Sequence, residues 1–537
     1  MNESFATVLE AVGDLRRDRV AVTHGDRSRT WAELDERAAR LAGHLAAQGI
    51  GPESRVAVAL YNGIEYLETV YAVLKLRAVP VNVNYRYRRD EIVALLGDAR
   101  AEAVVFDATL AERMGESRPA LPQLRTLLQV GDGDLPEWAG DYEQAVTAAE
   151  PAPRTERGND HWLMYTGGTT GRPKGVLVRH SWLFAAVSAN GFLLLGEPFP
   201  QTLEELRSTL HRSGTDREAM VCLPAPPLMH STGMYTSFGA LLAGGRVVYL
   251  ASTSYDPHEL AATVARERVD TVSIVGDVFA RPLADALDEA AAEGRPYDVS
   301  SLRRIISVGV TWSADVKQRL LQHADMVCRD LVAASEGGPF AVAETRRGDE
   351  AVTARFRLVP GARVIDERGA DVVPGSGQVG VLAAPADEHI RYQGDEVATA
   401  ATFREFGGQR WVVPGDMASL DSDRTVVFHG RGSRVINTGG EKVFAEEVEQ
   451  VLLTHPAVRD AMVVGTPDER WGARIVAVVA LHDGAELTEV EARAHVGAHL
   501  ADHKRPRELV LVAQLERSPS GKADLNWAAS VAAAPHS

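Results

Sequence analysis

Residues 55–83 read RVAVALYNGIEYLETVYAVLKLRAVPVNV and predict how the first half of the chain folds. Residues 55–60 form a short β-branched run, which is typical of a strand buried on both faces of a parallel sheet. Residues 64–76 carry apolar side chains at helical spacing, and residues 79–83 form a second apolar run. Parallel neighbours need a crossover connection, usually a helix, so this stretch predicts a β-α-β unit.

The same rhythm continues on both sides of this unit. Upstream, Thr30 and Glu33 have the spacing of a capping box in front of a helix with one apolar face. Downstream, helical stretches alternate with further strand-like runs at residues 103–106, 246–250, 271–275 and 304–308. Such alternation predicts an α/β fold, in which helices pack against layered parallel and mixed sheets.

The pattern changes toward the C-terminus and predicts a second domain. Short strands separated by turns begin near residue 355, and a new unit of strand, helix, strand and helix begins near Val435. We therefore predict a large N-terminal domain over residues 1–433 and a small α+β lid domain over residues 434–537.

Three other segments are expected to lie at the periphery of the molecule. Residues 135–157 and 196–216 are rich in Pro, Gly and charge, which is typical of surface connections or an insertion. The Ala-rich tail after Trp527 is expected to fray, as chain ends commonly do.

Composition excludes several classes of protein. The chain has 537 residues, 57 Lys plus Arg against 74 Asp plus Glu, and a formal net charge of −17. Hydrophobic residues make up 45% and charged residues 24%, which excludes a disordered or fibrous chain. The acidic balance argues against nucleic-acid binding, which needs a basic face. Two cysteines, Cys222 and Cys328, are too few for a disulfide framework.

The sequence shows no signal peptide at its start and no apolar run of the ~18 residues that a membrane span needs. We therefore expect a cytoplasmic protein without stable membrane insertion. We expect its partner to be a small-molecule acid or another oxyanion that serves as substrate. A homodimer is one oligomeric state that the sequence allows.

The most informative motif is residues 165–176, YTGGTTGRPKGV. Its glycines let backbone amides approach a bulky anion, and its hydroxyl groups and one lysine supply further donors. Gly175 follows the lysine where a Walker A loop has Ser or Thr, so the loop belongs to a different class. The motif predicts a polyphosphate-binding loop made by Thr166, Gly167, Gly168, Thr169, Thr170, Gly171 and Lys174.

Further motifs follow this loop along the chain. They are PLMHSTG at 227–233, LVAASEG at 331–337, VPGD at 413–416, Gly-Arg at 430–431, NTGGEKVF at 437–444 and RSPSGK at 517–522. In this order the motifs resemble those of the adenylate-forming superfamily. The residues within them look closest to those of actinobacterial-type fatty-acid and sterol-side-chain CoA ligases. The resemblance covers residues 30–527.

The resemblance implies a two-step, AMP-forming ligase. ATP and Mg²⁺ would convert a carboxylic acid into an acyl-adenylate, and coenzyme A would then take the acyl group as thiol co-substrate. Lys174 and its loop are implied to hold the ATP phosphates, with Ser335 at the α-phosphate. Glu336 is implied to hold Mg²⁺, a hard cation that prefers oxygen ligands.

Other motif residues are implied to bind the nucleoside part of ATP. The carboxylate of Asp416 would accept hydrogen bonds from both ribose hydroxyls, with Arg431 on the other side of the ribose. Gly309 and Asp330 are the candidates for the adenine pocket.

The resemblance also implies the catalytic and acyl-binding residues. Lys522 would reach the substrate carboxylate and the α-phosphate, where an ammonium group offsets the charge gathering in the transition state. Thr166, Glu336 and His230 complete the implied catalytic set. His230 also lines the implied acyl pocket, whose other candidates are Gly276, Asp277, Val278, Val310 and Ala333.

For the second step, the resemblance implies that the C-terminal domain turns about a hinge at Arg434. Gly439 and Gly440 would then line the tunnel for the thiol. The nearby acids Glu447 and Glu449 are expected to be solvated at the surface of a helix.

The chain departs from the family pattern at three positions. Val332 replaces the aromatic residue that usually stacks on adenine, and Ala333 replaces the Gly that usually opens the acyl slot. Arg434 replaces the usual hinge Asp, so the ion-pair partners of that Asp are expected to be lost.

These departures keep three alternatives open. An unusual oxyanion such as nitrite could be activated for transfer to an aryl amine, as in a diazotase of secondary metabolism. The acyl group could instead be loaded onto the thiol of a carrier protein. In a different functional class, the chain could be a weakened nucleotide-binding protein used for sensing or assembly.

Overall fold

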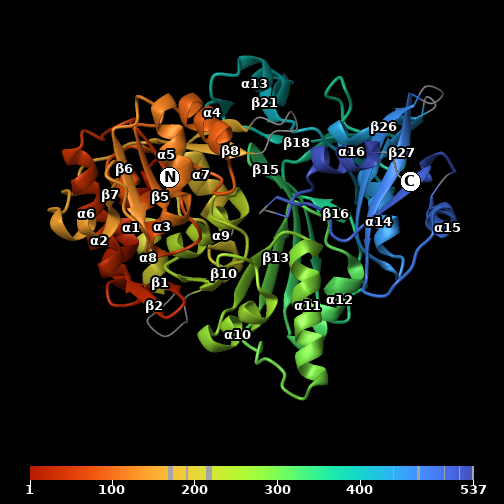
Figure 1. The fold of residues 1–537 in the computed structure, drawn as a ribbon, viewed down its shortest axis with the longest axis horizontal. Helices are drawn as coiled ribbons and strands as arrows, with labels where there is room; N and C mark the ends of the chain where they lie inside the picture. The colour runs from red at the N-terminus through yellow and green to blue at the C-terminus, as the bar shows by residue number, and fades with distance from the viewer. Residues whose placement is uncertain are drawn as a thin grey trace.

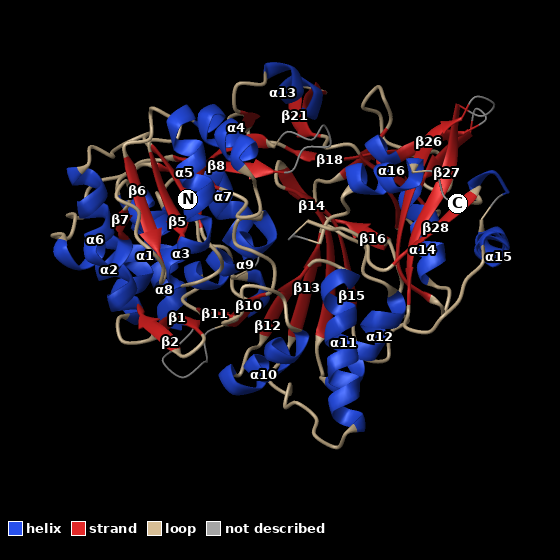
Figure 2. Ribbon diagram, viewed as in Figure 1, coloured by secondary structure: helices blue, strands red, loops and turns tan. Residues whose placement is uncertain are grey.

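The computed structural model describes residues 1–166, 173–188, 191–212, 220–438, 441–468, 472–500, 502–518 and 521–534. Figure 1 shows two large sheets with their helices on the N-terminal side and a small C-terminal unit at the opposite end of the molecule. Helices flank both large sheets, as the colouring of Figure 2 makes clear. The predicted α/β class agrees with this architecture.

The first sheet contains the predicted β-α-β unit. β3 (Arg55–Ala59) and β4 (Val79–Asn82) pair in parallel, and α3 (Ile64–Lys75) connects them. The strand order is β19-β9-β8-β4-β3-β5-β6-β7, with antiparallel pairing only at β8–β9 and β9–β19. The other strands are β5 (Ala103–Asp107), β6 (Thr126–Val130), β7 (Gly140–Asp141), β8 (His161–Thr166), β9 (Lys174–Arg179) and β19 (Arg391–Tyr392).

The second sheet has 15 strands and changes direction at its centre. Its order is β2-β1-β11-β10-β12-β13-β14-β15-β16-β23-β22-β18-β21-β20, with β17 paired to β18. Pairing is parallel from β1 to β14 and antiparallel from β14 onward.

The strands of the second sheet have the following bounds: β1 (Val20–His24), β2 (Arg27–Thr30), β10 (Val221–Pro224), β11 (Arg246–Tyr249), β12 (Thr271–Ile274), β13 (Arg304–Val308), β14 (Val327–Ala334), β15 (Gly337–Thr345), β16 (Arg355–Leu358), β17 (Arg363–Ile365), β18 (Gly380–Pro385), β20 (Phe403–Phe406), β21 (Gln409–Val412), β22 (Asp416–Leu420) and β23 (Val426–Arg431).

The helices of this part are α1 (Phe5–Arg16), α2 (Trp31–Ala47), α4 (Arg89–Ala99), α5 (Ala111–Ser117), α6 (Tyr142–Ala148), α7 (His180–Ser188), α8 (Leu203–Arg212), α9 (Ser231–Leu242), α10 (Pro257–Glu267), α11 (Asp277–Ala292), α12 (Ala314–His323) and α13 (Glu396–Thr402). Short 3₁₀ turns are η1 (Ala108–Leu110), η2 (Arg118–Ala120), η3 (Leu193–Leu195) and η4 (Gly432–Arg434).

The C-terminal unit has its own sheets and its own apolar core. Its elements are β24 (Val435–Thr438), β25 (Glu441–Phe444), α14 (Ala445–Leu453), β26 (Val458–Asp468), β27 (Gly472–Leu481), α15 (Glu489–His499), η5 (Asp502–Lys504), β28 (Glu508–Val512) and α16 (Leu525–Ala533). β26, β27 and β28 form one sheet, and β24 and β25 form a separate hairpin.

Local sequence signals predict some elements correctly and others wrongly. The capping box of Thr30 and Glu33 is present at the start of α2. The expected surface connections contain α6 and α8, and the tail expected to fray forms α16. The expected fraying of the tail is wrong, because α16 packs against the C-terminal core and buries Ala528 and Ala532.

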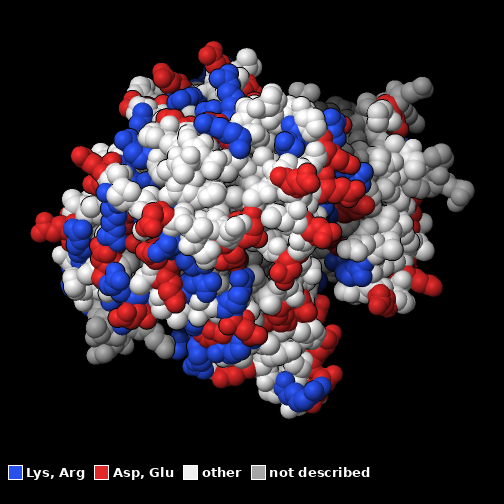
Figure 3. All heavy atoms as spheres, turned by 60° about the vertical axis from the view of Figure 1, so that its left-hand side comes forward, with Lys and Arg blue, Asp and Glu red and all other residues white. Residues whose placement is uncertain are grey.

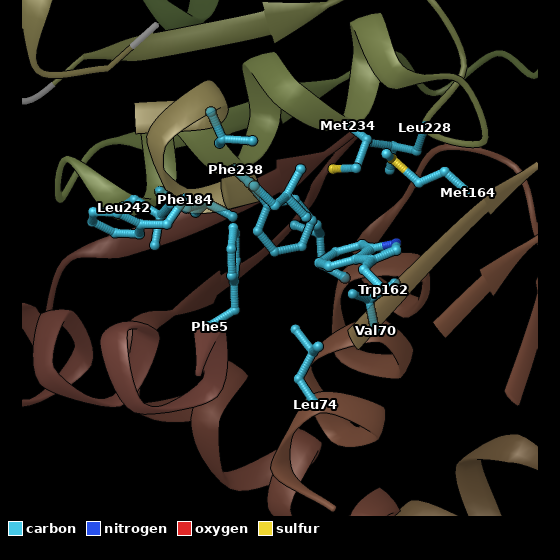
Figure 4. Close-up of a cluster of buried hydrophobic side chains, with 14 of the residues drawn as sticks. Phe5, Val70, Leu74, Trp162, Met164, Phe184, Leu228, Met234, Phe238 and Leu242 are labelled. Atoms are coloured by element: carbon cyan, nitrogen blue, oxygen red, sulfur yellow. The ribbon is translucent and has the colours of Figure 1, made fainter. Parts of the chain in front are cut away.

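The N-terminal helix is part of the central core. Phe5 of α1 makes edge-to-face contacts with Trp162 of β8, Phe184 of α7 and Phe238 of α9, at ring-centre distances of 5.7, 6.3 and 5.9 Å. Figure 4 shows Phe5 pointing into this cluster, with Leu74 and other apolar side chains around it. Because α9 precedes β11 of the second sheet, this cluster joins the helices of the two sheets.

Charged side chains of both signs are mixed on one face of the molecule (Figure 3). On the side of the molecule shown in Figure 3, Lys and Arg side chains are interspersed with Asp and Glu side chains. Among the described residues, each helix is too short or too polar to cross a membrane.

The buried position of Phe5 predicts a strong effect of its removal. We expect Phe5→Ala to destabilise the protein by about 3–5 kcal/mol, because it deletes a fully buried ring and leaves a cavity. Leu135→Ala is the control, since Leu135 is 47% exposed. Thermal unfolding followed by circular dichroism measures both variants. Equal midpoints for the two would contradict the assigned role of α1.

Candidate active site

The predicted phosphate loop connects β8 to β9. Thr166 and Lys174 face each other at the ends of these antiparallel strands, so the chain reverses between them. Gly167, Gly168, Thr169, Thr170 and Gly171 lie outside the described residues.

The strand before the loop is held by a residue that the sequence analysis missed. At the carboxyl end of β4, the Asn82 amide accepts a hydrogen bond from Tyr165 N at 2.7 Å and donates one to Tyr165 O at 2.9 Å. Asn82 also donates to the carbonyl of Met229, which precedes His230. A polar side chain at the end of an apolar strand was the available signal for this residue.

Lys174 lies beside two further residues that motif comparison did not select. Its Nζ atom is 3.8 Å from a carboxylate oxygen of Asp395 and 5.2 Å from the centre of the Tyr392 ring. Tyr392 lies in β19, which pairs with β9, and its hydroxyl donates to Glu336 Oε1 at 2.7 Å. Burial and the charge of Glu336 raise the pKa of Tyr392, so it remains a donor at neutral pH. Tyr392 therefore connects the predicted phosphate lysine to the predicted metal carboxylate.

Glu336 lies in a tight turn. Ala334 of β14 pairs with Gly337 of β15, which leaves Ser335 and Glu336 as the two residues of the hairpin turn. The Ser335 hydroxyl is 3.1 Å from that of Ser231, the first residue of α9. The turn therefore packs against the start of α9.

The donor set at this turn fits a nucleotide-bound Mg²⁺. Glu336 is buried, and the described residues contain no group of three or more potential metal-binding side chains. Mg²⁺ is usually bound through one or two carboxylates together with substrate phosphates and water, so a single carboxylate beside a phosphate loop is sufficient.

The pairing register of β22 and β23 places Asp416 next to Arg431. They are paired residues of β22 and β23, and Arg431 Nε donates to Asp416 Oδ1 at 3.2 Å. Burial raises the pKa of Asp416, although the charge of Arg431 acts in the opposite direction. A buried carboxylate with a cation beside it is suited to accept hydrogen bonds from a diol.

Lys522 is carried by a hairpin tip in the C-terminal unit. Ser518 N donates to Lys522 O at 2.8 Å, and Lys522 N donates to the Ser518 hydroxyl at 3.2 Å. Arg517 holds the base of this tip through two hydrogen bonds to Asp460, at 2.9 and 2.6 Å. Arg517 also donates to Gly521 O at 3.1 Å, so the described residues on the two sides of positions 519 and 520 are held together.

The hairpin tip is seated against the N-terminal part of the molecule. A Cβ atom on Gly521 would lie 3.4 Å from Val278 in the first turn of α11, which shows how closely the two parts approach. Lys522 keeps accessible surface, but the surrounding protein desolvates its amine and, with Arg431, lowers its pKa. The charges of Glu336 and Asp416 act in the opposite direction. The structure thus brings Lys522 within electrostatic reach of Glu336, Asp416 and Arg431.

His230 lies at the N-terminus of α9, and its ring makes no capping hydrogen bond to that helix. Burial, together with the charges of Lys522 and Arg86, lowers its pKa to about 3. The imidazole is therefore neutral at pH 7. Its Nε2 is buried and has no hydrogen-bond partner among the described residues, which is unusual for a buried polar atom and favours contact with a ligand.

The other pocket candidates differ in their surroundings. Gly309 directly follows β13 and has a φ of 103°. Ala333 lies in β14. Val310 packs against the core cluster that includes Phe279. Gly276 precedes α11, and a side chain there would collide with the carbonyl oxygens of Val310 and Thr311.

Two of the candidate acids are satisfied within the protein. Asp277 accepts hydrogen bonds from Ser313 and Arg281, and Asp330 is buried against Lys317 Nζ at 3.0 Å. Both carboxylates therefore accept hydrogen bonds from side chains or backbone of the protein itself.

The hinge candidate differs from the expectation. Arg434, in η4, forms ion pairs with Glu446 at 2.9 Å and with Glu449 at 2.5 Å, both on α14. The expected solvation of Glu449 is wrong, because this half-buried carboxylate pairs with Arg434 and accepts a hydrogen bond from Val463 N. Glu447 pairs with Lys504. Gly439 and Gly440 lie outside the described residues.

A basic cavity lies on the His230 side of the site. It has a volume of about 700 Å³ and is lined by Tyr61, Tyr85, Arg86, Arg88, Arg89, Arg113, Glu116 and Thr253. Arg113 donates to the carbonyls of Tyr85 and Tyr87, which positions the loop that carries Arg86. Among the described residues, neither Arg86 nor Arg88 forms an ion pair, so both guanidinium groups are available to an anion.

Comparison with known proteins agrees with this arrangement. The family model described as AMP-binding enzyme matches residues 9–384, and the model described as AMP-binding enzyme C-terminal domain matches residues 447–522. The chain is 36% identical over 534 residues to a 3-oxocholest-4-en-26-oate–CoA ligase of Rhodococcus rhodochrous, covering 98% of this chain and 95% of the relative. It is 38% identical over 542 residues to the medium-chain acyl-CoA ligase Mig of Mycobacterium avium, covering 97% and 96%.

Solved structures show the same fold. The anthranilate CoA ligase AuaEII in complex with anthranoyl-AMP superimposes with a TM-score of 0.82 at 20% identity, covering 99% of this chain and 97% of that one. A benzoate CoA ligase from Burkholderia xenovorans gives a TM-score of 0.80 at 22% identity, covering 98% and 100%. The predicted fold class and the predicted family are both confirmed: the chain belongs to the AMP-binding enzyme family.

Proposed function

We propose that this chain is an ATP-dependent, AMP-forming ligase that adenylates a carboxylic acid and transfers the acyl group to coenzyme A. The observation that carries the proposal is the close approach of Gly521, next to Lys522 in the C-terminal unit, to Val278 of α11, with the Lys522 amine in electrostatic reach of Glu336, Asp416 and Arg431. Family membership and the names of the relatives support the same activity.

In the proposed first step, a carboxylate oxygen of the acid attacks the α-phosphorus of ATP. The bond from that phosphorus to the β-phosphate oxygen breaks, and pyrophosphate leaves. Lys522 offsets the charge that gathers at the α-phosphate and the attacking oxygen, while Lys174 and the loop hold the other phosphates. Asp416 and Arg431 hold the ribose. The acid needs no general base, because a carboxylic acid is already ionised at neutral pH.

Mg²⁺ bound by Glu336 would supply charge neutralisation at the phosphates. The hydroxyl of Tyr392, which donates to Glu336, would hold that carboxylate in one orientation. Ser335, in the same turn, is proposed to contact the α-phosphate.

In the proposed second step, the thiolate of coenzyme A attacks the acyl carbon and AMP leaves. We propose residues 434–537 as the mobile domain and Arg434 as its hinge. The position of Arg434 in η4, between β23 and β24, supports this role, since few contacts have to change at such a connection.

The acid is proposed to be largely apolar. The relatives are named for medium-chain acyl groups and for a cholestenoate, which supports this class. Ala333, in place of the Gly of the family pattern, narrows the pocket by one methyl group and favours a slender acyl chain at that point. Nitrite with an aryl amine, and a carrier-protein thiol as acceptor, are alternative outcomes of the same substrate assays.

The basic cavity beside His230 is proposed to receive the phosphates of coenzyme A. Four arginine side chains line it against one glutamate, and its ring pair Tyr61–Tyr85, with centres 4.3 Å apart, offers an apolar surface. A polyanion is attracted to such a cavity even though the whole protein is acidic.

A cytoplasmic location is proposed as well. The free cysteines Cys222 and Cys328 are both buried, which is compatible with a reducing compartment. The homodimer stays a prediction, which light scattering tests.

The first prediction concerns Lys522. We expect Lys522→Ala to lower the rate of acid-dependent pyrophosphate release by about 100- to 1,000-fold, because it removes a charge aimed at the transition state. The dissociation constant for ATP, measured by calorimetry, should change little, and the conversion of a supplied acyl-adenylate to the CoA thioester should persist.

Lys504→Ala is the matched control, because Lys504 pairs with Glu447 inside the C-terminal unit. A normal rate of pyrophosphate release in Lys522→Ala would refute the role of the lysine. Release by the unaltered protein only with nitrite and an aryl amine would refute the acyl substrate.

The second prediction concerns the basic cavity. We expect Arg88→Ala to raise the KM for coenzyme A about tenfold, the equivalent of ~1.4 kcal/mol, and to leave the KM values for ATP and acid unchanged. Steady-state assays at about 50 and about 300 mM salt span a range over which charge screening changes strongly. Between these two conditions, the KM for coenzyme A should change less in the variant than in the unaltered protein. Arg368→Ala, on the exposed turn after β17, is the control. An unchanged KM for coenzyme A would place its phosphates elsewhere.

A further inference from the structure

Tyr235, in α9, carries a buried hydroxyl group without a hydrogen-bond partner among the described residues. Buried tyrosines elsewhere in the structure do have partners. Tyr249 donates to Ser237 at 3.2 Å, Tyr255 to the carbonyl of Phe279 at 2.7 Å, and Tyr66 to the carbonyl of Leu228 at 3.2 Å. A buried hydroxyl left unpaired costs free energy, so its presence in Tyr235 calls for a ligand that pairs with it.

The position of Tyr235 places this hydroxyl at the active site. Residues four apart lie on the same face of a helix, so Tyr235 shares a face with Ser231. Helical side chains also lean toward the N-terminus, which brings the Tyr235 ring toward the level of Ser231. Because the Ser231 hydroxyl is 3.1 Å from that of Ser335, this face of α9 looks onto the Ser335–Glu336 turn.

Electrostatics agrees with that placement. Burial raises the pKa of the Tyr235 hydroxyl, and the charge of Glu336 raises it further, so the two groups lie within electrostatic reach. The hydroxyl therefore keeps its proton at neutral pH and acts as a hydrogen-bond donor.

A second unpartnered polar atom lies at the start of the same helix. Nε2 of His230 is buried and lacks a partner among the described residues, and it feels the charge of Lys522. Two unsatisfied polar atoms thus lie near the N-terminal end of α9, five residues apart in the sequence, and both feel charges of the candidate active site.

We propose that Tyr235 is a specificity-determining residue, whose hydroxyl donates a hydrogen bond to an oxygen atom of the acid substrate. The proposal rests on the proposed acid–CoA ligase function. The acceptor has two sources with the same chemistry: an oxygen of the reacting carboxyl group, or an oxo or hydroxy substituent on the acyl chain. Apolar acids offer only the first source.

The test compares Tyr235→Phe with the unaltered protein on matched acids, octanoate against oxo- and hydroxy-octanoates, by pyrophosphate release. If the carboxyl group is the acceptor, kcat/KM should fall about tenfold or more for every acid. If a substituent is the acceptor, kcat/KM should fall only for acids whose oxo or hydroxy group lies within reach of the Tyr235 hydroxyl. For octanoate, which has no such group, kcat/KM should stay the same.

Stability provides the second readout. We expect Tyr235→Phe to unfold at the same or a higher temperature than the unaltered protein without ligands, since the hydroxyl has no partner to lose. Tyr249→Phe is the matched control: its hydroxyl is paired with Ser237, so this variant should unfold at a lower temperature with unchanged kcat/KM.

Two results would overturn the proposal: an unchanged kcat/KM for every acid in Tyr235→Phe, or a lowered unfolding temperature that matches the loss in Tyr249→Phe. Failure of the ligase function itself is distinguishable, because the unaltered protein would then release no pyrophosphate with any of the acids.

Discussion

The parallel direction of the strands is the constraint on which the site depends. In a parallel sheet all carboxyl ends meet at one edge, and the loops that follow them face a common space. Asn82 and Thr166 follow or end strands of the first sheet in this way, and Gly309 and Ser335 follow strands of the second. Lys174 at the start of β9, the start of α9 and the Ser335–Glu336 turn are neighbours for this reason, although Lys174 and Glu336 are far apart in the sequence.

The N-terminal part of the molecule supplies acidic groups to the candidate site, and the C-terminal unit adds a cation. Glu336 and Asp416 are buried carboxylates, and burial alone would disfavour their charged forms. Arg431 from the same sheet and Lys522 from the C-terminal unit offset that charge. A molecule with a net charge of −17 thus presents a local set of cations to an anionic ligand.

The connection between the two parts has an ion-pair arrangement of its own. Arg434, the proposed hinge residue, forms ion pairs with Glu446 and Glu449. Both acids lie on α14, the helix that follows it. The partners expected to be lost are replaced by partners of the opposite sign, which lie inside the C-terminal unit.

The sequence by itself determined the class of fold, the order of the motifs and the family. Hydrophobic period, capping residues and glycine-rich loops are local signals, so β3, α3 and the start of α2 could be predicted from them. It could not determine the helices α6, α8 and α16, where packing outweighs composition, nor the contacts of Asn82 and Tyr392 and the proposed role of Tyr235. Those residues carry no motif, and each acquires its role from a neighbour far away in the chain: Tyr165, Glu336 and the turn at Ser335. Only the tertiary structure decided these roles, because hydrogen bonding and burial depend on distances in space, which spacing along the sequence does not contain.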